Sequence, residues 1–210
     1  MKLLKRFSLL AVAVFAIFAF VSCGEYQVLN DVDRITSNFS DTSKDMTDFD
    51  SSNLGNDLVT LSYETDSQVM LLSDEEQTPL QLFIELRRQV IELHAQNMIE
   101  RTNIIALRMQ IKDAVDYIKG NQIMLLDDDK ANIQQAIDSL KELRQNLLDT
   151  RGQAYQKLID WQGNYTRENL PEINETYQEV IPVLESRHDM FQQATSELQT
   201  IYDILSDYME

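Results

Sequence analysis

From Leu80 to Tyr208, apolar residues recur at alternating steps of three and four positions, the spacing of one face of an α-helix. Short links near residues 119–127 and 166–170 divide this pattern into three stretches. The first stripe is apolar at nine of its eleven positions, which are Phe83, Leu86, Val90, Leu93, Asn97, Glu100, Ile104, Leu107, Ile111, Ala114 and Ile118. The pattern predicts three long amphipathic helices.

The first helix has signals at both ends. Thr78 can cap it, Pro79 suits the first helical position, and Gln81 completes a capping box. Gly120-Asn121 predicts where it stops.

The second helix is expected to begin at Asp127-Asp128-Asp129, because acidic side chains favour the positive end of the helix dipole. Its stripe continues to Tyr165. Gly152 and Gly163 fall inside it, each at a cost of about 1 kcal/mol relative to alanine. We expect packing to carry the helix through both glycines.

The third helix is expected to open near Asn169, with Pro171 and Glu172 in its first turn. Because the two links are too short to run the length of a helix, sequential helices must be antiparallel neighbours. Residues 79–210 are therefore predicted to form an all-α, elongated antiparallel bundle of three long helices.

Residues 23–78 allow two interpretations. Asp, Ser, Thr and Asn dominate from residue 30 to residue 57, which favours turns or disorder. The helical spacing nevertheless continues at Val28, Val32, Ile35, Phe39, Thr42, Met46 and Phe49. The first helix also carries an extra apolar line that a three-helix core would not fully cover, at Ile84, Ile91, Met98 and Ile105. This polar N-terminal segment is thus either a tether or, over residues 28–52, a weak amphipathic fourth helix.

Composition narrows the class of protein. Five glycines and three prolines in 210 residues leave few turns, which favours long helices over a β architecture. Residues 1–23 carry three basic side chains and no acidic one, so their removal takes the formal charge from -17 to -20. A chain this acidic is a poor partner for nucleic acid, and anionic lipid headgroups repel it as well.

Residues 1–22 have the layout of a signal peptide. Lys2, Lys5 and Arg6 precede an apolar run over residues 7–21, and Ser22 stands before Cys23, the one cysteine of the chain. The run is shorter than the roughly 20 residues of a permanent membrane span. We therefore expect the segment to be cleaved.

The sequence Phe20-Val21-Ser22-Cys23-Gly24 resembles the lipobox of bacterial lipoproteins. The resemblance implies cleavage before Cys23 and transfer of a diacylglyceryl group to its thiol, with a further fatty acyl chain such as palmitate on the new amino terminus. Two or more chains anchor a protein stably where one is marginal. The implied partner of Cys23 is the lipid bilayer. The implied location is the cell envelope, on the outer face of the cytoplasmic membrane or in the outer membrane.

All three stripes share a polar interruption. Folding the helices about turns near residues 123 and 168 brings Asn97 and Glu100 to the level of Arg144, Arg151 and Arg187. A buried Glu100 is costly unless an arginine pairs with it. Such a layer could set the register of the helices, or it could hold an anionic ligand through Arg144 and Arg187. In a third interpretation the arginines extend to solvent and form no layer.

Catalytic and metal motifs are weak. Glu185 and His188 have the Glu-x-x-His spacing of di-iron bundles, which also need a second such pair and bridging glutamates. No Gly-x-Ser-x-Gly motif and no phosphate-binding glycine loop occurs in the sequence. We predict no metal, no cofactor and no enzymatic activity.

These observations favour a membrane-anchored envelope lipoprotein that acts as a non-enzymatic helical scaffold or protein-interaction module, with an envelope protein as partner. The alternative is a ligand-sensing or solute-binding bundle, similar to the periplasmic helical domains of chemoreceptors, with the Arg/Glu layer as its pocket.

The anchor prediction can be tested by Cys23→Ser. Because the chain has no other thiol, this variant should not be acylated and should accumulate uncut or be released from the membrane. Detergent partitioning and mass spectrometry would measure both effects. A mature-sized Cys23→Ser protein in the detergent phase would contradict the lipobox interpretation.

Overall fold

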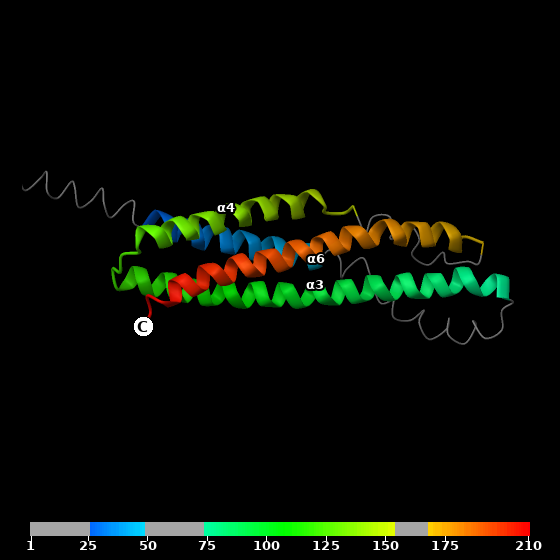
Figure 1. The fold of residues 1–210 in the computed structure, drawn as a ribbon, viewed down its shortest axis with the longest axis horizontal. Helices are drawn as coiled ribbons and strands as arrows, with labels where there is room; N and C mark the ends of the chain where they lie inside the picture. Colours follow the sequence, from blue (N-terminus) through cyan, green and yellow to red (C-terminus); the bar gives the residue numbers. More distant parts are fainter. Residues whose placement is uncertain (1–25, 49–73, 154–167) are drawn as a thin grey trace, which may run out of the picture.

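The computed structural model describes residues 26–48, 74–153 and 168–210. These parts of the chain are helical apart from short links, and they contain no strand. Residues 26–48 form an N-terminal helical segment, followed by α3 (Asp74–Gly120), α4 (Asp127–Asp149) and α6 (Leu170–Ser206). The helices lie side by side along one axis, so the predicted all-α elongated bundle is confirmed (Figure 1).

Successive helices alternate in direction. The N-terminal helical segment and α4 run one way along the bundle, and α3 and α6 run the other way (Figure 1). The six-residue link between α3 and α4 turns the chain sharply, with Gln122 in the left-handed region at φ 55°. This up-down arrangement is the antiparallel topology that the short links predicted.

The N-terminal helical segment is a full member of the bundle, which confirms the helical alternative over residues 28–48. Its apolar positions are buried in the core, at Leu29, Val32, Ile35, Phe39 and Met46. Residues 49–52 of the predicted helix lie outside the described residues.

Buried serine and threonine side chains explain how this polar sequence packs as a helix. The hydroxyl groups of Thr42, Ser43 and Thr47 donate to backbone carbonyls one turn earlier, at 2.8 to 2.9 Å. Each buried hydroxyl is thereby satisfied within its own helix. The weak helix propensity of these residues is outweighed by the burial of their apolar neighbours.

The start of α3 differs from the prediction. The helix begins at Asp74, so Pro79 lies inside it and the capping box at Thr78 and Gln81 is wrong. Asn174 of α6 donates to the Pro79 carbonyl at 2.9 Å, which ties this part of α3 to its neighbour. Contacts with α6 therefore stabilise the helix at the position where local signals predicted its start.

The end of α4 also differs from the prediction. The helix stops at Asp149, and Gly152 takes a φ of 79°, a left-handed conformation through which an α-helix cannot continue. The prediction of one helix through Gly152 is therefore wrong. The remainder of the predicted stripe, up to Tyr165, lies largely outside the described residues. By contrast, α6 opens as predicted, after Asn169 with Pro171 and Glu172 in its first turn.

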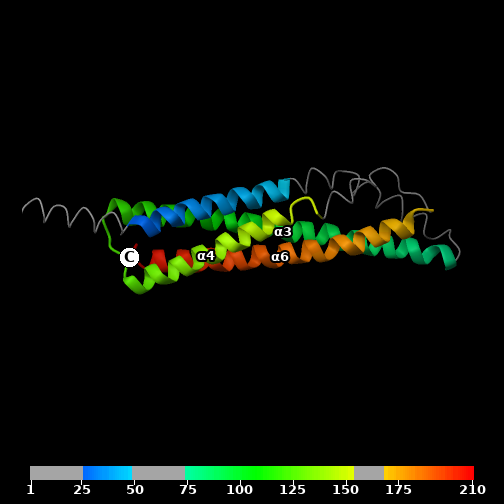
Figure 2. The same cartoon turned by 90° about the horizontal axis from the view of Figure 1, so that it is seen from above.

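Within the described residues, the core consists of two apolar clusters. The larger one joins the N-terminal helical segment, α3, α4 and α6, whereas the smaller one joins the first halves of α3 and α6. In the smaller cluster the rings of Phe83 and Tyr177 meet edge to face, with centroids 5.7 Å apart. Among the described helices, the N-terminal segment and α4 cover only one half of the α3–α6 pair (Figure 2).

The contribution of the N-terminal helical segment can be measured by Phe39→Ala. Phe39 is fully buried, so its truncation should lower the free energy of unfolding by about 3 to 5 kcal/mol. Asp33→Ala, at an exposed position of the same segment, should change it by less than about 0.5 kcal/mol. Urea unfolding measures both values. A cost for Phe39→Ala as small as that of the control would show that the segment is not part of the cooperative core.

Candidate functional site

The predicted polar layer lies between the two apolar clusters. Asn97 falls between Val90 of the smaller cluster and Ile104 of the larger one, and it is fully buried. Arg187 occupies the matching place on α6, and its side chain is also fully buried. These two residues confirm a buried polar interruption on both helices.

Arg187 joins the middle of α6 to the end of α4. Its Nε donates to the Thr150 hydroxyl at 3.1 Å, and its guanidinium group also donates to the Thr150 carbonyl. Thr150 is the C-terminal cap of α4, where carbonyl groups lack partners within the helix. A buried cation is favoured there, at the negative end of the helix dipole.

Asn97 pairs with a residue that the sequence did not place in the layer. His188 Nδ1 lies 3.2 Å from Asn97 Oδ1, within hydrogen-bond distance. The amide nitrogen of Asn97 is buried and has no hydrogen-bond partner in the part of the chain that the structure describes. One turn earlier on α3, burial lowers the pKa of His94 below its usual value.

Glu100 bonds to neutral side chains and does not pair with an arginine of the layer. Its carboxylate is half-buried and accepts hydrogen bonds from Thr195 at 2.9 Å and from Asn103 at 3.4 Å. Among the described residues it forms no ion pair with Arg144 or Arg187. Thr195 of α6 faces Glu100 at this level, so an arginine partner, which a buried Glu100 would need, is replaced here by neutral donors.

The other two arginines lie away from the buried layer. Arg144 is half-buried and donates from Nε to the Thr42 hydroxyl at 2.9 Å. Arg151 is exposed and pairs with Asp45 at 2.8 Å. Both connect the C-terminal part of α4 and the residues after it to the N-terminal helical segment. They therefore lie at the surface and are not members of the buried layer.

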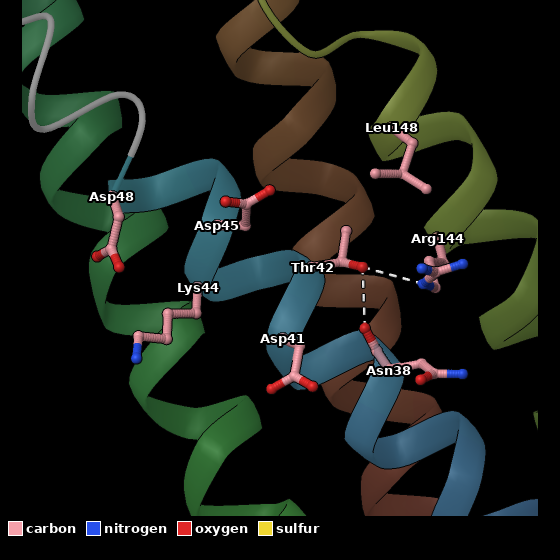
Figure 3. A pocket seen from close by; sticks show the side chains of 8 residues that line it. All are labelled: Asn38, Asp41, Thr42, Lys44, Asp45, Asp48, Arg144 and Leu148. Carbon is pink, nitrogen blue, oxygen red and sulfur yellow. Dashed lines mark hydrogen bonds between the residues drawn. The ribbon is translucent and has the colours of Figure 1, made fainter.

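Arg144 helps to line an open groove of about 510 Å³ between α4 and the N-terminal helical segment (Figure 3). The groove is lined by Asn38, Asp41, Thr42, Lys44, Asp45, Asp48, Arg144 and Leu148. Sequence reasoning missed this site, although Asp41, Asp45 and Asp48 follow helical spacing.

The groove is poorly suited to an anion. Three carboxylates line it against two cationic side chains, Lys44 and Arg144. Asp45 and Asp48 are engaged by Arg151 and Arg101, in ion pairs of 2.8 Å. Figure 3 shows the Asp41 carboxylate and the Lys44 amine extending from the segment. The groove therefore has the features of a polar seam between two helices.

The three described parts of the chain hold no cluster of three or more His, Cys, Asp or Glu side chains placed to bind a metal ion. Within the same ranges, no helix is both long and apolar enough to cross a bilayer. Cys23, the predicted lipidation residue, lies outside the described residues.

The outer face of α3 carries an exposed stripe without charge, which we call the α3 stripe. Its members recur at helical spacing over residues 91–109 and are Ile91, Ala95, Ile99, Thr102, Ala106 and Met109. Ile91, Ile99 and Met109 are 40 %, 60 % and 61 % exposed. Part of this surface was visible in the sequence, since Ile91 belongs to the extra apolar line on this helix.

Comparisons with known proteins give no further guidance: no protein-family model, no curated protein and no solved structure matches the chain.

Alanine substitutions of Arg187 and Glu100 should lower the free energy of unfolding by different amounts. Arg187→Ala should lower the free energy of unfolding by about 3 kcal/mol or more, because it leaves a cavity and removes the donor to two half-buried oxygens of Thr150. Glu100→Ala should lower the same free energy by about 1 kcal/mol or less, because it removes a half-buried carboxylate that accepts two hydrogen bonds from neutral donors. Urea unfolding of both variants measures the difference. Equal losses would contradict the assignment of Arg187 as the structural centre of the layer.

Proposed function

We propose that this chain is a lipid-anchored cell-envelope protein whose helical bundle is a non-enzymatic scaffold for another protein. The observation that carries the proposal is the α3 stripe. Large exposed apolar patches on soluble domains mark interaction surfaces, whereas single exposed apolar residues are ordinary. The α3 stripe contains three large apolar side chains separated by small residues, with no charge from Ile91 to Met109 along its line.

Charge sharpens the contrast between this stripe and the rest of the molecule. The chain carries a formal charge of -17, so most of its surface repels acidic partners and stays solvated. Ile91 and Met109 are 18 positions apart along α3, which is about 27 Å at the rise of an α-helix. Its small residues leave room for a partner side chain or helix to approach the α3 backbone.

The ligand-binding alternative has less support. Arg187 is fully buried against Thr150, and Arg144 shares its groove with three aspartates. An anionic ligand at either place would displace existing hydrogen bonds or face like charges.

A photo-crosslinking amino acid at position 99 tests the proposal in native envelope membranes. We expect a discrete adduct with one envelope protein from position 99 and none from position 135, an exposed glutamine on α4. Ile99→Glu should reduce co-purification of that protein about 10-fold or more, because it places a charge in an apolar interface. Gln135→Glu, the matched control, should leave it unchanged.

Both glutamate variants should melt within a few degrees of the parent protein, since both positions are exposed. Equal crosslinking from positions 99 and 135, or co-purification that Ile99→Glu leaves intact, would contradict the α3 stripe as the binding surface.

A further inference from the structure

The α3–α4 link, the start of the N-terminal helical segment and the C-terminus of α6 meet at one end of the bundle (Figures 1 and 2). Lys119 donates to Asn30 at 2.8 Å, which places residue 30 beside the end of α3. Tyr26, Ile123 and Tyr208 pack against the same apolar cluster. We call this region the hairpin end.

Exposed apolar side chains are concentrated at the hairpin end. Leu126 is 68 % exposed and Met124 is 61 % exposed, on either side of the buried Leu125. Met209, at the end of the chain, is 39 % exposed. Three large apolar side chains thus face solvent on a short turn and its neighbour, where polar residues would be ordinary.

The turn that carries Leu126 is held in place by hydrogen bonds. The Tyr208 hydroxyl accepts the backbone N–H of Leu126 at 2.9 Å and donates to the Asp129 carboxylate. Burial and the bond to Asp129 both raise the pKa of Tyr208 above its usual value. The exposed side chains therefore project from a fixed backbone.

The anchor predicted at Cys23 would lie next to this end, and this step rests on the proposed function. Cys23 precedes Tyr26 by three residues, and three residues span at most about 11 Å when fully extended. That reach is comparable with the depth of one headgroup region, since the bilayer exceeds its hydrocarbon core by roughly 5 to 8 Å on each side. An acylated Cys23 would hold the hairpin end at the lipid surface.

We propose that Met124 and Leu126 insert into the interfacial region of the bilayer beside the acylated Cys23. The acyl chains supply the binding energy, and the two side chains fix which end of the bundle meets the membrane. Asp127 and Asp128 follow directly and are exposed, so they stay in water and limit the depth of insertion.

This contact orients the α3 stripe. Along α3, residues 109 to 91 lie progressively farther from the hairpin end. The acidic sides of the bundle are repelled by anionic lipids, which favours contact through the tip over contact along its length. The scaffold then projects from the membrane with the stripe accessible to a partner.

Tryptophan fluorescence of the acylated full chain in phosphatidylcholine vesicles tests the insertion. Trp161 is the one tryptophan of the chain, so Trp161→Phe provides a dark background for Leu126→Trp or Met124→Trp. The emission of each introduced tryptophan should shift to shorter wavelength when the protein binds the vesicles. Its intensity should fall by about half or more when the lipids carry bromine on their acyl chains. Ile99→Trp, at a position 60 % exposed on the α3 stripe, is the matched control and should do neither.

Vesicle flotation separates the two levels of the proposal. Protein that floats, with Leu126→Trp and Met124→Trp as accessible to aqueous iodide as Ile99→Trp, overturns the insertion and leaves the anchor standing. Protein that does not float overturns the anchor and the insertion together. Flotation with bromolipid quenching confined to Leu126→Trp and Met124→Trp supports both.

Discussion

The hydrogen bonds from Arg187 to Thr150 hold the C-terminal end of α4 against the middle of α6. A fully buried guanidinium group is stable only where acceptors surround it, and the open carbonyl end of α4 supplies them. This contact sets the length of α4 against α6. It also separates the larger apolar cluster from the smaller one, so the extent of each core depends on it.

The same level of the bundle shows how polar groups replace a continuous core. Asn97 and His188 pair across α3 and α6, while Glu100 is satisfied by Thr195 one turn farther along. A slip of one helix by a turn would strand these groups in an apolar environment. These hydrogen bonds therefore favour the observed register of α3 against α6, and no ion pair joins the described members of the layer.

Packing of the neighbouring helices also decides which face of α3 is exposed. The N-terminal helical segment covers one flank of α3 through Ser37, Asp48 and Asn30, which contact Arg108, Arg101 and Lys119. α6 covers the other flank, and the outward face stays open. An apolar stripe on that open face and an apolar tip at the hairpin end interrupt an otherwise acidic rod, and they lie on different parts of it. We propose the first as a surface for a protein partner and the second as a contact with lipid.

Local signals in the sequence were reliable where the helix depends on its own residues. The stripes from Phe83 to Leu205 predicted the helices and their directions, because helical spacing buries one face and short links force antiparallel neighbours. Asn169, Pro171 and Glu172 predicted the start of α6 for the same reason. The signal peptide and the lipobox at Cys23 are likewise read from the sequence, and they remain predictions.

Tertiary structure decided what depends on neighbours. Whether Gly152 is carried inside a helix or ends it depends on its backbone conformation, which a stripe of apolar residues does not reveal. The Ser- and Thr-rich segment is helical because Phe39 and its apolar neighbours are buried by three other helices. Sequence spacing placed Glu100 near the level of Arg187, yet Glu100 faces Thr195 of α6. Which side chains face each other depends on helix rotation, which sequence spacing alone does not reveal. The sequence therefore determined the helices, and packing determined their ends, their partners and the surfaces left open.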